Sequence, residues 1–441
     1  MASAPLQILS ASWIVPVNPD NQVLTDHALV IDGDRIAAIG PREEIVAAYP
    51  GVAVVDLADC VLIPGLVNAH THAAMTLFRG YADDLPLMEW LNHYIWPAEM
   101  ALTSPEFVRD GTRLAVAEML GGGTTCFCDM YFFPDVTAAV AVEAGIRAAI
   151  GMIAINFASA WATDIDDYLS KGLRVHDQFN DEPLITTLFA PHAPYTVSGE
   201  ALQRISTLAE ELDVPVVTHL HETEHEVTQA MESNGERPIH MLRKAGLLSP
   251  RLLAVHMTAL HESDIEACAH NGVHVIHCPE SNLKLGSGIC PVPELLEAGI
   301  NVALGTDGAA SNNDLDMFSE MRTAALLAKG STGRPTVVPA HTALRMATQN
   351  GADALGLGDR IGSLEVGKQA DIVAVDLARP ATEPVYDPIS QLVYAAGRDQ
   401  VSQVWVAGRQ VVVDGSVVTL DIARTLANAR MWRQRIADTA Q

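Results

Sequence analysis

The chain has 441 residues, 49% of them hydrophobic, which is enough for a large buried core and excludes an intrinsically disordered protein. Its 27 basic and 54 acidic residues leave a formal net charge of −27, so nucleic acids and anionic membrane surfaces are poor partners. No apolar run has the ~18 residues of a membrane span, no secretory signal is expected, and six scattered cysteines favour a cytoplasmic protein with reduced thiols.

Short strand patterns around tight glycine turns occur near both ends of the chain. They flank Gly33 near the N-terminus and Gly408 near the C-terminus. The two ends resemble each other in composition and differ from the middle. We therefore expect one small β-sandwich domain built from residues 1–60 and 365–425, followed by a helical segment over residues 426–441.

The middle of the chain, residues 61–364, alternates short apolar runs with longer amphipathic ones. Eight strand patterns separated by helical patterns predict an α/β fold with a (β/α)8 barrel of the TIM type. Ser198 and Ser263 are expected to cap two of the helices. A doubly wound open sheet is the alternative, but no Gly-x-Gly-x-x-Gly turn follows the first strand. The strands are expected at 61–68, 124–130, 147–154, 184–190, 214–220, 252–256, 273–278 and 300–305.

Two histidines one residue apart, His70 and His72, follow the first predicted barrel strand. Residues i and i+2 of a strand point to the same face, so both imidazoles can face one metal ion. Residues after the C-terminal ends of barrel strands converge on one site. Six more candidates stand at such ends: Asp129, His192, His219, His256, His277 and Asp307.

The fifth and eighth strands carry the residues best suited to complete a catalytic centre. His219 suits a third metal ligand, and Glu222, three residues later, can act as general acid and base without binding the metal. The alternative for Glu222 is an acidic first helical turn shared with Glu224. Asp307, next to Gly308, can bind a metal and accept a proton from water, or simply form an Asp-Gly turn.

Two further histidines have less direct roles in this interpretation. His256 can orient the attacking water or stabilise a developing charge, whereas a structural role is favoured for His277. Three imidazoles and one carboxylate around an open position describe a catalytic metal site. Zn²⁺, which lowers the pKa of its water to about 7, is the expected metal, and Fe²⁺ is also compatible. No lysine lies in a predicted strand to bridge a second metal, so one divalent metal per subunit is expected.

With these residues in view, the chain resembles the amidohydrolase superfamily over nearly its whole length. Within it, the chain is similar to the 5′-methylthioadenosine/S-adenosylhomocysteine deaminases, which share its Trp96-Pro97-Ala98-Glu99 and Ala190-Pro191-His192-Ala193-Pro194 segments. The motifs that carry the resemblance are the runs 64–72, 219–222, 255–256, 305–308 and 362–372.

The resemblance implies a role for each matching position. Glu222 would carry a proton to a purine ring nitrogen, and His256 with Asp307 would orient the nucleophile. Glu99 would accept hydrogen bonds from the ribose hydroxyls, and His192 would contact the purine. The metal would be held by His70, His72, His219 and Asp307. The reaction would be hydrolytic deamination of an adenine nucleoside to the inosine analogue and ammonia, a reaction of purine salvage.

One departure from the family bears on the substrate. Relatives that use S-adenosylhomocysteine well have arginines after the third strand, suited to the amino-acid carboxylate. Here Met152 and Phe157 stand in that stretch. An apolar wall, with Met152 as a substrate contact, predicts that 5′-methylthioadenosine is preferred over adenosine and S-adenosylhomocysteine.

Other functions remain open on the sequence alone. Another heteroaromatic ring of the guanine, pterin or triazine type could be deaminated or dechlorinated by the same centre. A metal-free binding or scaffold protein is the alternative of a different class, although the full set of ligands argues against it. The superfamily also leads us to expect a homo-oligomer that acts on a small molecule.

Overall fold

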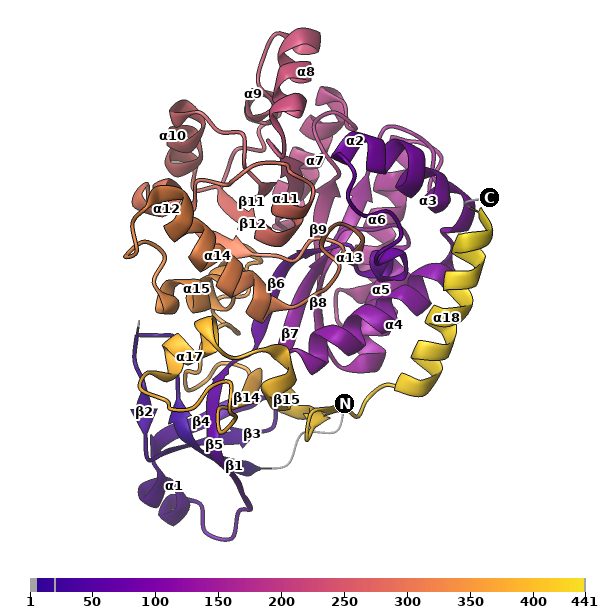
Figure 1. Ribbon diagram of the computed structural model, residues 1–441. Helices are drawn as coiled ribbons and strands as arrows, with labels where there is room; N and C mark the ends of the chain where they lie inside the picture. Colours follow the sequence, from indigo (N-terminus) through magenta and orange to yellow (C-terminus); the bar gives the residue numbers. More distant parts are fainter. Residues whose placement is uncertain (1–5, 20, 440–441) are drawn as a thin grey trace.

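The computed structural model describes residues 6–19 and 21–439 and contains two sheets (Figure 1). One is an eight-stranded parallel sheet from the middle of the chain, surrounded by helices. The other sheet combines strands from both ends of the chain, so the first and last strands in the sequence belong to one sheet (Figure 1). The predicted class, an α/β barrel with a separate β domain, is confirmed.

The strands of the barrel follow one another in chain order, each parallel to the next. Nearly all of their residues are buried, as in barrels covered by helices outside and packed inside. The first and last strands meet where the Asp307 N–H donates to the His70 carbonyl over 3.0 Å, and the Asn68 amide donates to the Thr306 hydroxyl over 2.7 Å. The strands are β6 (Leu66–Thr71), β7 (Thr124–Asp129), β8 (Arg147–Ala154), β9 (Ile185–Pro191), β10 (Val216–Leu220), β11 (Leu252–His256), β12 (His274–His277) and β13 (Val302–Leu304).

Helices connect these strands, and several begin at a side chain that caps the first free N–H groups. Ser198, for example, accepts from the Ala201 N–H at the start of the helix that follows β9. The helical segments after β6 are η1 (Ala73–Phe78), α2 (Leu87–Trp90), η2 (Leu91–Ile95), α3 (Trp96–Leu102) and α4 (Pro105–Gly121). Those after β7 to β10 are α5 (Pro134–Ala144), α6 (Ile165–Phe179), α7 (Gly199–Leu212), α8 (Glu224–Asn234) and α9 (Pro238–Lys244). The remaining ones are α10 (Glu262–Asn271), α11 (Pro279–Lys284), α12 (Val292–Glu297), α13 (Ala309–Asn312), α14 (Met317–Thr332), α15 (Ala340–Met346) and α16 (Gln349–Ala354).

The second sheet joins the two ends of the chain through antiparallel pairing of β5 with β14. Side chains from strands of both halves, among them Leu29, Leu62 and Trp405, meet in one buried cluster. Its strands are β1 (Gln7–Ile14), β2 (Leu24–Thr25), β3 (His27–Asp32), β4 (Arg35–Pro41), β5 (Val54–Pro64), β14 (Ile372–Asp376), β15 (Val401–Val406), β16 (Arg409–Val413) and β17 (Ser416–Val417). The associated helices are α1 (Arg42–Ala48), α17 (Pro388–Tyr394) and η3 (Arg398–Gln400).

The C-terminal helix, α18 (Ile422–Thr439), packs along the outside of the barrel beside α4 (Figure 1). The Trp432 indole N–H donates to Asp110 over 2.9 Å, and the Asn428 amide donates to the same carboxylate. The last two residues of the expected helical segment, 440 and 441, lie outside the described residues. No helix in the described part of the chain combines the length and apolarity needed to cross a membrane.

Two details differ from the sequence-based expectations. The predicted strand 61–68 is two strands, because residues up to Pro64 pair with β14 in the small sheet and the chain enters the barrel after Gly65. A Cβ on Gly65 would lie only 2.0 Å from the Thr125 hydroxyl. Ser263 does not cap its helix, because α10 begins one residue earlier, at Glu262. The residue before the helix is His261, whose backbone N–H donates to the Asp264 carboxylate.

Candidate active site

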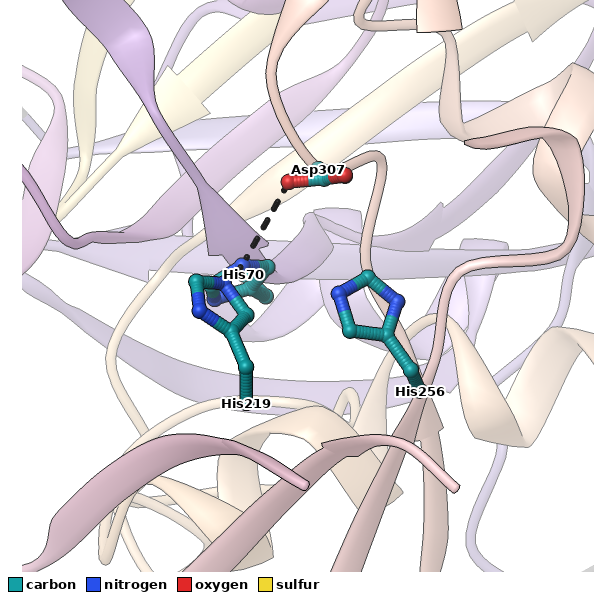
Figure 2. Close-up of side chains that lie close together, drawn as sticks. All are labelled: His70, His219, His256 and Asp307. Carbon is teal, nitrogen blue, oxygen red and sulfur yellow. Dashed lines mark hydrogen bonds and ion pairs between the residues drawn. The ribbon is translucent and has the colours of Figure 1, made fainter. Parts of the chain in front are cut away.

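The ends of β6, β10, β11 and the loop after β13 bring four polar side chains into one buried group (Figure 2). The potential ligand atoms of these four residues all lie within 4.8 Å of one another. Gly305 permits this closeness, since a Cβ there would lie 2.8 Å from the His70 backbone nitrogen. The four residues are His70, His219, His256 and Asp307.

His72 borders this group and contacts the same carboxylate. Its Nε2 atom lies 3.1 Å from Asp307 Oδ1, compared with 3.5 Å for His70 Nε2. Its Nδ1 atom donates to the Met130 carbonyl over 2.6 Å, so Nε2 is the ring nitrogen that remains available to a metal. The structure therefore brings together all four expected metal ligands, with His256 as a fifth donor beside them.

The donor set suits a divalent cation. The Nε2 atoms of His70 and His219 face each other at 3.1 Å, where a cation can accept both lone pairs. Burial lowers the pKa of His70 to about 4 and holds the pKa of His219 well below its usual range, so both rings are neutral, as metal ligands must be. The His256 Nδ1 atom lies 2.8 Å from Asn282 Oδ1, a contact that directs the His256 Nε2 atom to the group.

Asp307 stays ionised in this setting. Burial opposes its charge, but hydrogen bonds from His70 and His72 hold the pKa of this carboxyl well below its usual range. Burial also disfavours a charged His72, yet the Asp307 carboxylate raises the pKa of His72 to about 9, so this ring must release a proton to bind a metal. The second oxygen of Asp307 accepts 2.7 Å hydrogen bonds from the hydroxyls of Ser281 and Ser311. Asp307 is thus held from both sides.

Glu222 lies beside this group on a tightly bound loop. Its backbone N–H donates to Glu226 over 2.7 Å, and its carbonyl accepts from the Thr258 hydroxyl over 2.7 Å. Its Oε2 atom is 3.9 Å from His256 Nε2, and Ser287 donates to Oε1 over 3.4 Å. Burial raises the pKa of Glu222, so its protonated form is more accessible than that of an exposed glutamate, as a group that takes up and releases a proton requires.

Three non-glycine residues of the site adopt left-handed backbone conformations. Their φ angles are +52° at His221, +76° at His256 and +60° at Asp307. Such conformations are costly for residues with a Cβ and persist only where the surroundings enforce them. They occur where the chain turns out of the barrel strands. The side chains of His256 and Asp307 join the group, whereas His221 contacts the Ala259 carbonyl and accepts from the Ile239 N–H.

A cavity of about 260 Å³ opens above the group. His192 lines this cavity, and its Nδ1 atom contacts the Thr196 hydroxyl at 3.1 Å. Burial lowers the pKa of His192 to about 3. Glu99 lines the wall from α3 and accepts a 2.6 Å hydrogen bond from the Tyr131 hydroxyl. Burial raises the pKa of Glu99 to about 7.

Met152 is not brought into this cavity, contrary to expectation. Its side chain packs against α6, where a Cβ on Gly172 would lie 3.0 Å from the Met152 Cβ. Side chains alternate along a strand, so the next residue, Ile153, lines the cavity instead, together with Ile155 and Phe157. The apolar wall is present and includes Phe157, as expected, but Ile153 and Ile155 line it in place of Met152.

Two other candidates lie outside the cavity lining. Asp129 accepts from the Ala73 N–H over 2.7 Å and from the Thr71 hydroxyl, which supports the turn after β6. His277 is buried at the end of β12, where burial lowers its pKa to about 3. Both positions agree with structural roles.

Sequence reasoning missed Tyr131, Asn282, Ser281 and Ser311, which bind site residues directly. Tyr131 could have been suspected because it is the first residue after a predicted strand, 124–130. The two serines and Asn282 lie in short helical segments after β12 and β13, and only the folded chain shows which residue each one contacts.

Comparison with known proteins identifies similar chains. Residues 61–411 match the model of the amidohydrolase family, and residues 28–51 match a bacterial imidazolonepropionase-like composite domain. A 5-methylthioadenosine/S-adenosylhomocysteine deaminase of Teredinibacter turnerae is 49% identical over 428 residues, which are 97% of each chain.

Solved structures show the same architecture. An adenosine deaminase from Xanthomonas campestris with bound zinc is 52% identical, with a TM-score of 0.97 over 98% of each chain. Atrazine chlorohydrolase TrzN from Arthrobacter aurescens TC1, complexed with zinc, is 25% identical, with a TM-score of 0.90 over 97% of this chain and 100% of that one.

Proposed function

This chain belongs to the amidohydrolase family, and from that membership we propose that it is a metal-dependent deaminase of adenine nucleosides, with 5′-methylthioadenosine as its preferred substrate. The observation that carries the proposal is the placement of Glu222. Its carboxyl group lies 3.9 Å from His256 Nε2, beside the His/Asp group, and lines a cavity large enough to take up a small molecule.

The reaction replaces the amino group of the adenine ring by oxygen from water. His70, His72, His219 and Asp307 would hold a divalent metal, which would lower the pKa of water at the site to about 7. Glu222 takes a proton from the attacking water and gives it to the neighbouring ring nitrogen as the C–O bond forms. It then takes the proton of the new hydroxyl group and gives it to the amino nitrogen as the C–N bond breaks. Ammonia leaves, and the product is the inosine analogue.

Other residues orient the reacting groups. His256 and Asp307 face the attacking water, and neutral His192 contacts the purine ring. Glu99 accepts hydrogen bonds from the ribose hydroxyls at the opposite wall of the cavity. Its acceptor role is strongest in the ionised form, which is well populated near its pKa of about 7.

The lining of the cavity supports an apolar or absent 5′ substituent. None of the described residues that line it is Arg or Lys, whereas Ile153, Ile155 and Phe157 contribute apolar surface. A methylthio group gains from such contacts. The charged tail of S-adenosylhomocysteine would lose solvation without finding a cation. The preference is therefore 5′-methylthioadenosine first, with adenosine and S-adenosylhomocysteine used less well.

The cofactor in this proposal is one Zn²⁺ per subunit, with Fe²⁺ as a compatible substitute. Zinc is present in the two solved relatives described above, and the imidazole and carboxylate donors suit it. The proposal also includes a homo-oligomer in the cytoplasm. Six cysteines without disulfides are compatible with a reducing compartment.

A nucleoside panel tests this function. Zinc-loaded enzyme is assayed for ammonia release and for the ultraviolet change from adenine to hypoxanthine, with 5′-methylthioadenosine, adenosine, S-adenosylhomocysteine and free adenine. We expect the highest kcat/KM for 5′-methylthioadenosine and very low activity on free adenine. Equal or better use of S-adenosylhomocysteine would refute the substrate preference.

A second candidate function is supported by the likeness to atrazine chlorohydrolase. Attack on a chlorinated or aminated triazine, or on guanine or a pterin, needs the same metal, acid and base. These compounds lack the ribose that Glu99 is proposed to bind. Chloride or ammonia release from them at rates above those of the nucleosides would favour this candidate.

A further inference from the structure

Tyr131 and Glu99 form a hydrogen-bonded pair in the lining of the cavity, and the proposed reaction gives no role to Tyr131. The Tyr131 hydroxyl donates to Glu99 Oε1 over 2.6 Å. Tyr131 is 4% exposed, and both residues line the cavity among apolar neighbours such as Trp96 and Met100. Among the described residues, Glu99 Oε2 has no hydrogen-bond partner. One carboxylate oxygen is therefore engaged and the other is available.

We propose that Tyr131 is a positioning residue for ribose recognition, which holds Glu99 by one oxygen so that the other can accept from the sugar hydroxyls. This inference rests on the proposed function as a nucleoside deaminase. A glutamate side chain has three rotatable bonds, and an unrestrained carboxylate would lose conformational entropy when the substrate binds. A carboxylate already held in place avoids that loss.

The position of Tyr131 suits this task because its backbone is held firmly. It follows Met130, whose N–H donates to the Thr71 carbonyl over 2.9 Å and whose carbonyl accepts from His72 Nδ1 over 2.6 Å. The loop after β7 thus binds the end of β6 and carries the tyrosine that contacts α3. One short segment, Met130 and Tyr131, therefore contacts both His72 of the proposed metal site and Glu99 of the proposed ribose site.

The electrostatics of the pair agree with this role. Burial raises the pKa of Glu99, while the hydrogen bond from Tyr131 opposes the increase. His72, the other titratable group near this carboxyl, opposes it only when its ring is protonated. Without the hydroxyl, more of Glu99 would be protonated at neutral pH and would accept hydrogen bonds less well. The contact therefore supports both the orientation and the charge of the carboxylate.

The test compares wild-type enzyme with Tyr131→Phe, which removes only the hydroxyl. Both zinc-loaded proteins are assayed with 5′-methylthioadenosine and with its 2′-deoxy and 3′-deoxy analogues, and their zinc content is measured. We expect KM for 5′-methylthioadenosine to rise roughly tenfold, with kcat within about twofold and the zinc content unchanged. The increase should be much smaller for the analogue that lacks the hydroxyl bound by Glu99, and it should vanish in the Glu99→Gln background.

Tyr81→Phe is the matched control, because Tyr81 packs on the same hydrophobic cluster without contacting Glu99. An unchanged KM in Tyr131→Phe, or an equal increase for every analogue, would overturn the role in ribose recognition. Loss of zinc or of kcat alone would also overturn it. If the wild-type enzyme deaminates no nucleoside, the proposed function itself fails, which is a different result from an active wild type with an unaffected variant.

Discussion

Glu222 and Glu226 are bound to each other through one backbone N–H group: the Glu222 amide donates to the Glu226 carboxylate over 2.7 Å. Glu226 also accepts from the His221 amide over 3.2 Å. Both carboxyl groups are buried, but Glu226 is occupied by the loop, whereas Glu222 faces the cavity. Glu226 thus shapes the loop, whereas Glu222 is the acid available for the proton transfer that we propose.

Glu222→Gln should leave the fold and the bound zinc intact and lower kcat by a factor of about 10²–10⁴, because an amide cannot carry the proton. Steady-state kinetics with 5′-methylthioadenosine and metal analysis of the same sample measure both effects. Glu224→Gln, an exposed change two residues away, is the control and should keep wild-type activity. If Glu222→Gln kept most of its kcat, another group would be the proton carrier.

His219→Ala should lose the metal, since it removes one of the ligands that converge on Asp307. We expect zinc content after dialysis to fall from about one equivalent to a small fraction, with activity falling in parallel. His225→Ala, at an exposed position of α8, serves as the control. Full zinc retention in His219→Ala would remove this histidine from the ligand set.

The sequence allowed the barrel and the convergent histidines to be predicted, because strand ends can be recognised from apolar runs that stop at polar residues. It did not allow the direction of Met152 to be predicted. Strand β8 is buried on both faces, so its composition shows no alternation to reveal which residues point inward. The break at Gly65 was missed for a similar reason, since two apolar strands of different sheets adjoin there.

The contacts among polar residues of the site also could not be predicted from the sequence. The Tyr131–Glu99 pair joins segments 32 residues apart, and the Asn282–His256 pair joins segments 26 residues apart. No local rule of capping or periodicity links such positions. They follow from the radial arrangement of loops over the barrel, which only the folded chain shows.

Phe157→Arg should shift the substrate preference toward S-adenosylhomocysteine. Phe157 lines the mouth of the cavity with 52% of its surface exposed, so an arginine there can stay solvated until it meets a carboxylate. We expect the ratio of kcat/KM for S-adenosylhomocysteine to that for 5′-methylthioadenosine to rise about tenfold. Phe157→Leu should not change the ratio. An unchanged ratio in the arginine variant would mean that the 5′ substituent lies elsewhere.

KM for 5′-methylthioadenosine should fall as the pH rises from about 6 to about 8. Burial raises the pKa of Glu99 to about 7, so its ionised fraction grows over this interval from roughly one-tenth to nine-tenths. The ionised form is the better acceptor for ribose hydroxyls. KM measured across this range should be nearly flat in Glu99→Gln. A KM that rises with pH in the wild type, or an equal slope in the variant, would contradict this role.

Arg147→Met should destabilise the protein by about 3–5 kcal/mol, because it leaves Asp371 as an unpaired buried charge. The two side chains are each 1% exposed, and their bidentate hydrogen bonds of 3.2 and 3.0 Å join β8 of the barrel to the start of β14. Thermal or urea unfolding measures the loss. Arg334→Met, in the exposed pair with Glu297, should change stability by less than about 1 kcal/mol. Equal losses of stability in the two variants would show that the buried ion pair stabilises the protein no more than the exposed one.

The most direct test of the whole account is product analysis in ¹⁸O-labelled water. Zinc-loaded enzyme is incubated with 5′-methylthioadenosine, and mass spectrometry of the product is combined with an ammonia assay. The account predicts the inosine analogue with one solvent oxygen in the purine ring and one ammonia released for each product molecule. An unchanged nucleoside with no ammonia, from enzyme shown to contain its full equivalent of zinc, would contradict it.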